Sequence, residues 1–543
     1  MKIQFKDKVY EIPSPVNNES EVIIKVENYA FIALPENMNT NHFGFQNPYV
    51  KFIFFLIHEG IKLTLNKVKT SIFQKKIRAE RQVVFVYGQV KCENGFAIAI
   101  GPQDCPYSEY LSFPKALTFN VDHRRDIQND YKIILKHFSN NPESLETLYN
   151  YSPYSGKKLL LKLENILEDK VKGQCCMANP ENNLKKLKKL TRRRYRKQKR
   201  NSTIKKNKYD LFLAGAGAYA CSYILPNLKK VNYHTIIDCN PILATVVGEK
   251  YGFRYKDTSV ERALDKLKES KNPILVIATY HSTHLPIVEH ALSINLNTKI
   301  FLEKPPVTSA DQLNKLIALR DNPNHFIEIG YNRRHSPLII KAKKIIDNFN
   351  GPITITCIVK ELNIPLSHWY YWPTQKTRVT GNLSHWIDLG IFIIHSNPVS
   401  ITAISASDQF PADESSVVVL FEDGSLLTLI ASDRGNQLRG VQEYIDIRRA
   451  DLTITIDDFL KMKVQESCHQ KIYRKIIRDK GHKRMYEDFI YDIQNRKNAK
   501  YPNRDLLLST TLYLSISDML LSNIRYREIS LDEYETTYTR TSK

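Results

Sequence analysis

Three small residues near the middle of the chain have a spacing that suits phosphate binding. Gly215, Gly217 and Ala220 form a Gly-x-Gly-x-x-Ala pattern directly after the apolar run Leu211 to Ala214. A buried strand, a glycine-rich turn and a helix form the first unit of a dinucleotide-binding fold. Gly215 permits the tight turn, Gly217 lets the backbone approach a pyrophosphate at the helix N-terminus, and Ala220 lets the helix pack on the strand. An ordinary strand–helix unit with incidental glycines is the alternative.

An acidic residue ends the next expected strand. Asp238 follows the run His234 to Ile237 and lies 23 residues after Gly215. At about this distance a carboxylate meets the hydroxyls of an adenosine ribose. No Lys or Arg follows at once, so NAD is favoured over NADP as the cofactor.

Strand-like and helix-like segments alternate from residue 209 to residue 333, where they would position these groups. We expect strands at 211–214, 234–237, 274–278, 299–302 and 326–329, with helices such as 259–267 and 308–319 between them. This alternation predicts a parallel sheet covered by helices on both faces. Ligands bind at the carboxyl ends of such strands, where Thr279-Tyr280 and Glu303-Lys304-Pro305 fall.

After Pro337 the pattern changes. A helix is expected at 338–349, helices at 485–494 and 506–521 end the chain, and strands are expected at 353–359, 400–406, 415–422, 425–431 and 442–447. Short turns between these strands predict a largely antiparallel sheet. The aromatic run Trp369 to Trp372 either stacks on a sugar ring or belongs to the core.

Three motifs, in this order after the glycine pattern, resemble the Gfo/Idh/MocA oxidoreductases. Ile277 to His284 resembles the loop after their fourth strand, Phe301 to Pro305 their Glu-Lys-Pro signature, and Gly330 to Pro337 the entry into their second domain. The likeness covers about residues 209 to 530. It implies a Rossmann domain followed by a substrate domain whose sheet forms a floor under the nicotinamide.

Two further motifs resemble a narrower group, the bi-domain oxidoreductases of polysaccharide biosynthesis, which carry an alcohol-dehydrogenase-like front half. The motifs are Ile454 to Phe459 and Lys480 to Lys483. The strand-rich residues 1–122 fit that front half, since Ile12 to Pro15 and Tyr107 to Leu117 resemble a GroES-like domain. Its zinc ligands do not carry over. No cysteine precedes Cys92, and His58-Glu59 has no cysteine upstream of it, so we expect no metal site.

The resemblance implies that Lys304 reaches the reacting sugar hydroxyl beside the nicotinamide. A hydride leaves a carbinol carbon only if the hydroxyl proton is removed, and a buried amine with a lowered pKa can take that proton. His385 is the second catalytic candidate, and helical spacing puts Asp388 on the same face, where it would orient the ring. Sugar dehydrogenases of the family often have Asp four residues before this histidine. Gly381 occupies that position here, which leaves the carboxylate-assisted base in doubt.

Further roles are expected near these two residues. Glu303, Lys304, Thr279 and Tyr280 are assigned to cofactor binding together with the glycine pattern and Asp238. Asn382 and Asp388 are expected to contact substrate. Arg334, like Arg333, either binds an anionic group of the substrate or forms a salt bridge between domains. His281 and His284 are expected to be structural.

The charge of the chain is concentrated in one segment. The net charge is +22, of which 14 positive charges lie between Lys185 and Lys208 without an acidic residue, which leaves +8 for the rest. This segment is a solvated linker, or it contacts RNA, anionic lipid or a polyanionic substrate. Only Tyr195 interleaves as an aromatic, so a dedicated nucleic-acid module is not expected.

Together these patterns predict an α/β and α+β multidomain protein. Its expected parts are a β-rich GroES-like domain, a helical and basic connector, a Rossmann NAD-binding domain and a mostly antiparallel substrate domain, at 1–122, 123–208, 209–333 and 334–543. Eight scattered cysteines, no signal-peptide core and no membrane-spanning run predict a cytoplasmic protein, and a homo-oligomer stays open.

The predicted function is an NAD(H)-dependent oxidoreductase acting on a sugar or nucleotide-sugar in glycan or surface-polysaccharide synthesis. A non-catalytic nucleotide sensor or scaffold is the alternative, because Gly381 replaces the usual acid and the front domain lacks its zinc ligands. A nucleic-acid binder, supported only by residues 185–208, is the third hypothesis.

Overall fold

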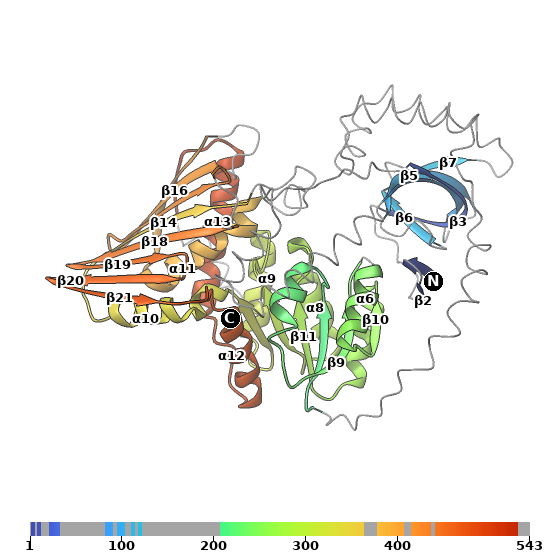
Figure 1. The fold of residues 1–543 in the computed structure, drawn as a ribbon, viewed down its shortest axis with the longest axis horizontal. Coiled ribbons are helices and arrows are strands. Elements are labelled where there is room, and N and C mark those ends of the chain that lie inside the picture. Colours follow the sequence, from blue (N-terminus) through green and yellow to red (C-terminus); the bar gives the residue numbers. More distant parts are fainter. Residues whose placement is uncertain are drawn as a thin grey trace. The chain divides into compact units, whose positions relative to one another are not determined.

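The computed structural model describes the N-terminal strands and most of the chain from residue 207 onward (Figure 1). The described residues are 2–5, 8–11, 21–32, 82–90, 95–103, 110–114, 118–121, 207–239, 241–362, 377–406, 414–435 and 440–529. The connector before residue 207, the aromatic run Trp369 to Trp372 and His58-Glu59 lie outside them. The predictions made for those segments are therefore not addressed by the structure.

The described N-terminal residues form antiparallel strands. Strands β1 (Lys2–Phe5) and β2 (Lys8–Glu11) pair with each other. A five-stranded sheet has the order β6-β3-β4-β5-β7, with β3 at Glu21–Ile32, β4 at Gln82–Val90, β5 at Phe96–Gln103, β6 at Tyr110–Pro114 and β7 at Thr118–Val121. The sheet fits the strand-rich composition, and the GroES-like assignment stays a prediction.

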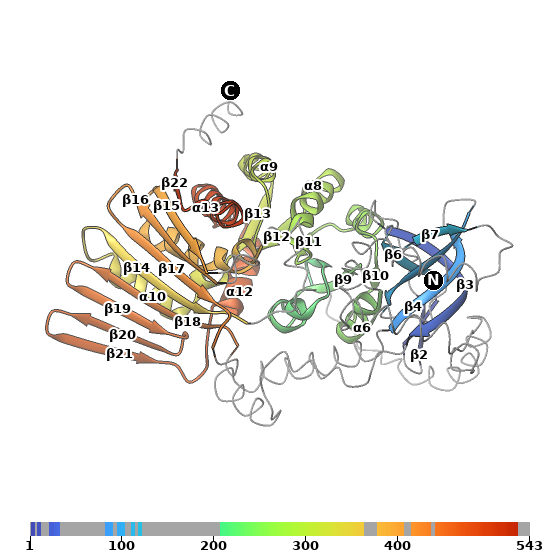
Figure 2. The ribbon, with the colours of Figure 1, turned by 90° about the horizontal axis from the view of Figure 1, so that it is seen from above.

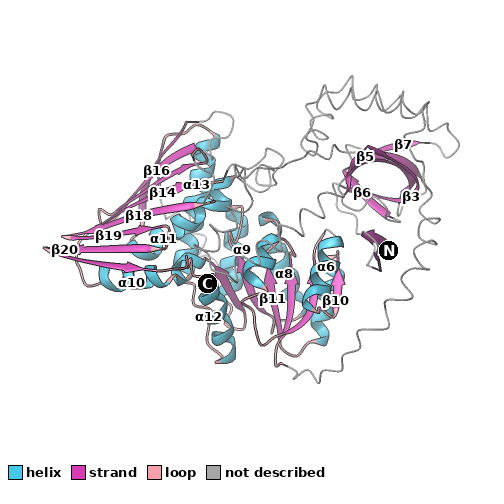
Figure 3. Cartoon of the chain, viewed as in Figure 1, coloured by secondary structure: helices cyan, strands magenta, loops and turns pink. Residues whose placement is uncertain are grey.

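The alternating segment forms a six-stranded sheet with the order β10-β9-β8-β11-β12-β13 (Figure 3). Its strands are β8 (Asp210–Ala214), β9 (Asn232–Ile237), β10 (Tyr255–Asp257), β11 (Pro273–Ile277), β12 (Lys299–Glu303) and β13 (Phe326–Gly330). The pairings are parallel. In chain order this is the 3-2-1-4-5-6 arrangement of dinucleotide-binding sheets, so the predicted Rossmann sheet is confirmed.

Helical segments follow most of these strands. They are η4 (Ala220–Ile224), α6 (Pro241–Tyr251), α7 (Val260–Leu264), η5 (Asp265–Glu269), η6 (His281–Thr283), α8 (His284–Ile294) and α9 (Ala310–Asp321). Ser309 caps α9 by accepting a hydrogen bond from the amide of Gln312. The helical turn η4 after the glycine pattern is short and ends before Pro226, which lacks the amide hydrogen that a continuing helix needs.

The C-terminal part is built on a nine-stranded sheet with the order β21-β20-β19-β18-β14-β17-β16-β15-β22 (Figure 2). The strands are β14 (Ile353–Lys360), β15 (Pro398–Ser405), β16 (Glu414–Phe421), β17 (Leu426–Ser432), β18 (Gln442–Arg449), β19 (Leu452–Asp457), β20 (Lys461–Glu466), β21 (His469–Arg474) and β22 (Tyr526–Glu528). Only β14 and β17 pair in parallel among them, so the prediction of a mostly antiparallel sheet is confirmed.

One face of this sheet carries the core. Alternate residues of β14, from Ile353 to Val359, are buried and pack with apolar side chains of α10 (Pro337–Ile346), α11 (Ser384–Ile394) and α13 (Asn503–Leu521). The short helical turn η7 (Asn332–His335) leads from β13 into α10, η10 (Val379–Leu383) leads into α11, and α12 (His482–Gln494) follows β21. None of the helices in the described part has the length and apolar character needed to cross a membrane.

Candidate active site

The turn after β8 requires glycine at one position and leaves open space at another. Gly215 has a φ of +95°, and a Cβ there would lie 2.2 Å from the carbonyl oxygen of Ala278. Only glycine allows this close approach to the end of β11. A Cβ on Gly217 would meet no heavy atom within 4 Å, so a pyrophosphate could approach the backbone there. Ala220 is buried at the start of η4. These features fit a bound dinucleotide.

The buried ring of His284 joins the loops that follow β11 and β12. Its Nδ1 lies 2.8 Å from the carbonyl oxygen of Pro305, and its Nε2 lies 3.3 Å from that of Thr279. Burial lowers the pKa of His284 to about 4, so the ring is neutral near pH 7 and carries one N–H. The shorter contact indicates that Nδ1–H donates to Pro305. The predicted cofactor contacts Thr279 and Tyr280 belong to the loop that precedes His284.

A buried hydrogen-bonded cluster surrounds Glu303, the last residue of β12. The hydroxyl of Tyr486 in α12 donates a hydrogen bond to Glu303 Oε1, and Tyr219 hydrogen-bonds to the same two residues. Burial raises the pKa of Glu303 to about 7, although Tyr486 and Lys304 lower it. The cluster ties the glycine turn to β12 and α12. Its tyrosines were not among the site residues predicted from the sequence.

Lys304 extends from the end of β12 toward the segment that precedes α11. Its Nζ donates a hydrogen bond to the carbonyl oxygen of Gly381 at 2.6 Å. Burial lowers the pKa of Lys304 to about 8, while Glu303 opposes this shift and Arg333 adds to it. An amine with such a pKa has a neutral fraction near physiological pH, which is the form that accepts a proton.

His385 lies near the start of α11, four residues after Gly381. Because Lys304 binds the Gly381 carbonyl oxygen, the histidine lies close to the lysine, and the charge of Lys304 acts on its ring. Burial and the positive charges of Arg333 and Lys304 hold the pKa of His385 well below its usual value. The ring is therefore neutral at pH 7. Its Nδ1 is buried and has no hydrogen-bond partner among the described residues.

Asp388 and Arg334 belong to a buried ion-pair network. Arg334 donates hydrogen bonds of 2.8 and 2.6 Å to the Asp388 carboxylate and one of 2.6 Å to Asp505. The Tyr501 hydroxyl donates to Asp388 at 2.5 Å. The prediction that Asp388 orients His385 is therefore wrong, because helical spacing sets a direction but not the partner that competes for the carboxylate. For Arg334 these contacts favour the salt bridge over binding of a substrate anion.

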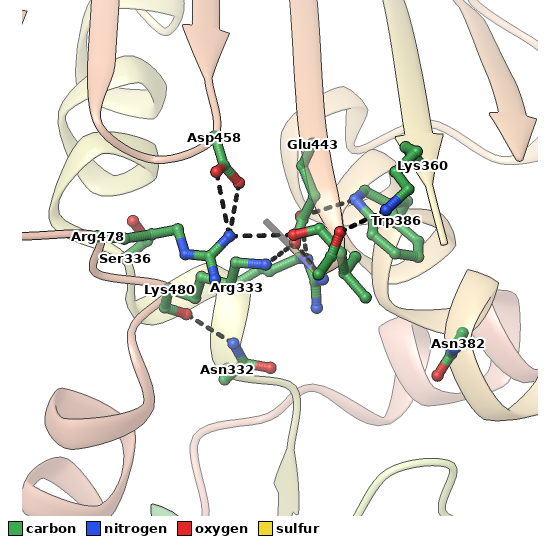
Figure 4. Close-up of polar contacts among 12 residues, drawn as sticks. Asn332, Arg333, Ser336, Lys360, Asn382, Trp386, Glu443, Asp458, Arg478 and Lys480 are labelled. Atoms are coloured by element: carbon green, nitrogen blue, oxygen red, sulfur yellow. Dashed lines mark hydrogen bonds and ion pairs between the residues drawn. The ribbon is translucent and has the colours of Figure 1, made fainter. Parts of the chain in front are cut away.

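Arg333 is held in the same way by a second buried carboxylate. Its Nε and Nη2 each lie 2.7 Å from an oxygen of Glu443, and Lys480 and the indole nitrogen of Trp386 donate to the same carboxylate (Figure 4). The guanidinium lies 4.3 Å from the centre of the Trp386 ring. Although burial raises the pKa of Glu443, Arg333 and Lys480 hold it well below its usual range. This carboxylate is fully satisfied.

The motif Lys480 to Lys483 places Lys480 in that cluster. Gly481 has a φ of +90°, and a Cβ there would lie 2.2 Å from the backbone oxygen of Asn332. The Asn332 side chain donates a hydrogen bond of 2.7 Å to the Lys480 carbonyl oxygen. The contact between this motif and the turn η7 therefore requires glycine at position 481. Close packing against η7 explains why the motif contains this residue.

Asn382, predicted to contact substrate, binds a carboxylate that the sequence reading did not single out. Its Nδ2 donates to Oε2 of Glu361 at 3.0 Å. Glu361 directly follows β14 and is only 1% exposed, and its Oε1 has no hydrogen-bond partner in the described part of the chain. Burial raises the pKa of Glu361, and the positive charge of Arg378 opposes this shift most strongly.

A sequence signal for the two missed carboxylates exists. Glu361 continues the two-residue period of the buried positions that end at Val359, and Glu443 has the same phase as the buried Ile445. A charged residue in phase with the apolar face of a strand must find partners inside the protein. Neither position lies in one of the sequence motifs that predicted the site.

Asp238 directly follows β9, where its amide donates a hydrogen bond of 3.1 Å to the carbonyl oxygen of Asp257. The segment Tyr233 to Ala263 belongs to a different compact unit from the residues described above. The contact of Asp238 with an adenosine ribose stays a prediction.

No protein-family model matches the chain. Among curated proteins it matches "Putative oxidoreductase YteT" of Bacillus subtilis (strain 168), with 24% identity over 215 residues, which are 37% of this chain and 50% of that protein. The chain therefore spans about half the length of this relative.

Solved structures resemble a larger part of the chain. An oxidoreductase domain protein from Kribbella flavida has a TM-score of 0.52 and 14% identity, over 60% of this chain and 100% of its own. The aldose-aldose oxidoreductase from Caulobacter crescentus, complexed with glycerol, has a TM-score of 0.52 and 15% identity over the same shares. GenD2 from gentamicin A biosynthesis, in complex with NAD, has a TM-score of 0.50 and 16% identity, over 61% and 99%.

These similarities establish the fold. The chain therefore shares its fold with these solved oxidoreductases, and the fold has the Rossmann sheet and the mostly antiparallel part that the motifs predicted. The bi-domain resemblance of the N-terminal part stays a prediction.

Proposed function

We propose that this protein is an NAD(H)-dependent oxidoreductase that transfers a hydride to or from a carbinol or keto carbon of a sugar or nucleotide-sugar. The observation that carries the proposal is the place of Lys304. Its amine lies at the carboxyl end of β12, bound to Gly381 and near His385, on the sheet edge that also holds the glycine turn. Ligands of parallel sheets bind at this edge.

The residues present fit the cofactor. The turn at Gly215 and the open space at Gly217 suit a pyrophosphate, and Asp238 is the expected ribose contact. Bound NAD would supply the hydride acceptor. That GenD2 was solved with NAD, and that an aldose-aldose oxidoreductase has the same fold, supports this cofactor and this substrate class.

The roles of the two proton-handling side chains follow from their surroundings. Lys304 has a pKa of about 8, and its neutral amine accepts the hydroxyl proton of the substrate. The neutral ring of His385 hydrogen-bonds the same oxygen and adds no positive charge beside the lysine. Asn382, whose side chain is held by Glu361, binds a substrate hydroxyl. Gly381 has no side chain, so no carboxylate at that position can act as a base.

A place in glycan or surface-polysaccharide synthesis, in the cytoplasm, completes the proposal. It is supported by the motifs Ile454 to Phe459 and Lys480 to Lys483, which resemble the bi-domain group. Fold alone does not fix a pathway.

The test is titration of the protein with NADH, followed by hydride exchange with a panel of sugars and nucleotide-sugars. We expect NADH binding and exchange with at least one panel member. Absence of binding at millimolar NADH and NADPH would contradict the proposal. Binding without exchange across the panel would favour the second candidate, a nucleotide-binding sensor or scaffold, which the missing carboxylate at Gly381 supports.

A further inference from the structure

We propose that Glu361 is a positioning residue of the Lys304 site, whose carboxylate fixes Asn382 and supplies a buried negative charge where Gly381 has no side chain. This inference rests on the proposed function, because it concerns how Lys304 is prepared to accept a proton. It assigns a role to the end of β14, an element that none of the catalytic motifs includes.

The connection runs through two hydrogen bonds and adjacent residues. Lys304 Nζ donates to the carbonyl oxygen of Gly381 at 2.6 Å, and the next residue, Asn382, donates from its side chain to Glu361 at 3.0 Å. Loss of the Asn382–Glu361 hydrogen bond would release the Gly381–Asn382 segment from the end of β14. Glu361 therefore fixes, from the end of β14, the peptide that accepts the hydrogen bond of the Lys304 amine.

Glu361 differs from Glu443 in how completely its carboxylate is paired. Glu443 accepts hydrogen bonds from three side chains, including two from Arg333 at 2.7 Å. Arg378 approaches Glu361 Oε2 only to 3.8 Å, and Oε1 has no partner among the described residues. A buried carboxylate oxygen without a hydrogen bond costs folding free energy, so the position of Glu361 is not explained by a contribution to stability.

The charges around the two groups come from several elements. The charge that acts most strongly on Glu361 is that of Arg378, which directly precedes η10. The charge that acts most strongly on Lys304 is that of Glu303, the last residue of β12. The other ionisable groups are Arg333, Glu443 and Lys480 around Glu361, and Arg333, Glu361, His284 and His385 around Lys304. Because Glu361 favours the charged form of the amine, it keeps the pKa of Lys304 from falling further.

The test measures the pKa of Lys304 in the substrate-free protein. Lysine labelled with ¹³C at Cε is incorporated, the Lys304 signal is assigned by its loss in Lys304→Met, and its shift is followed against pH. Glu361→Gln keeps an oxygen for Asn382 and removes the charge. We expect the pKa of Lys304 to fall by about one pH unit in this variant. Glu466→Gln, at the exposed end of β20, is the matched control and should leave it unchanged.

An unchanged pKa of Lys304 in a folded Glu361→Gln protein would overturn the proposal, since a merely structural role would alter stability alone. Glu361→Asp keeps the charge and should return the pKa of Lys304 toward the wild-type value. If Glu361→Gln does not fold, infrared spectra of the wild type and Glu361→Asp at pH 8 decide the question. A protonated-carboxyl band that shifts with Glu361→Asp contradicts the proposal, and its absence supports it. None of these readouts requires turnover, so failure here is distinct from failure to bind NADH.

Discussion

The amine of Lys304 donates a hydrogen bond to the carbonyl oxygen of Gly381, with 2.6 Å between the two atoms. The lysine follows the fifth strand of the Rossmann sheet, and the glycine belongs to η10, which directly precedes α11. Because α11 continues directly from η10, this contact brings His385 close to Lys304, although the two residues are far apart in the sequence. It joins the carboxyl end of β12 to the segment that precedes α11, where the proposed chemistry takes place.

The pH dependence of turnover should report the Lys304–Glu303 pair. Proton abstraction needs the neutral amine, whose pKa of about 8 lies below the usual 10.5, so oxidation should rise with pH and level off above about 8. In Tyr486→Phe, Glu303 loses a hydrogen-bond donor and its pKa rises. A protonated Glu303 no longer favours the charged amine, so the rising limb should move to lower pH.

The matched control for this profile is Tyr513→Phe, which removes a buried hydroxyl that donates to the carbonyl oxygen of Val307 rather than to a carboxylate. The rising limb of its pH–turnover profile should coincide with that of the wild type. Since coupled groups titrate as a pair, the limb is assigned to Lys304 and Glu303 together. Identical profiles in all three proteins would refute the assignment.

The two glycines of the turn after β8 should separate binding from stability. Gly217→Ala places a Cβ in open space, so folding should be unaffected while NADH affinity falls on the order of tenfold, because the pyrophosphate approaches that backbone. Gly215→Ala forces a clash with Ala278 at positive φ and should lower the free energy of unfolding by about 2 kcal/mol or more. Urea unfolding and NADH titration measure the two effects. Wild-type affinity in Gly217→Ala would argue against pyrophosphate binding at this turn.

The Glu443 cluster should dominate the stability of the second domain. Glu443→Gln leaves Arg333 and Lys480 buried without their counter-charge, and we expect a loss of about 3–5 kcal/mol in the free energy of unfolding. Asp446→Asn on the same strand removes a pair with the exposed Arg448 and should cost less than about 1 kcal/mol. Denaturant unfolding of both variants checks this, and similar losses would show that the buried cluster carries no special weight.

The sequence predicted the Rossmann sheet well because local patterns encode it. Its parallel strands are short apolar runs, and five of the six were placed to within about two residues by that pattern. The missing strand, Tyr255–Asp257, has three residues and only a tyrosine to mark it. The strands Lys461–Glu466 and His469–Arg474 were not predicted either, because lysines and other polar residues interrupt their apolar alternation.

The candidate site was predicted only where a motif marked it. Lys304 and His385 were found through their motifs and lie near each other in the structure. The partner of Asp388 was not predictable, because Arg334 and Tyr501 come from other elements whose packing local spacing does not contain. Glu361 and Glu443 stand at strand positions where only their phase with the buried face distinguishes them from surface residues.

Substitution of Lys304 by methionine tests the central claim most directly. The variant keeps the length of the side chain and removes the amine, so kcat for hydride transfer should fall by at least about 100-fold, while NADH affinity changes little because the glycine turn is intact. Lys299→Met, at the half-buried start of the same strand, is the control and should retain turnover. Turnover of Lys304→Met at the wild-type rate would contradict the account.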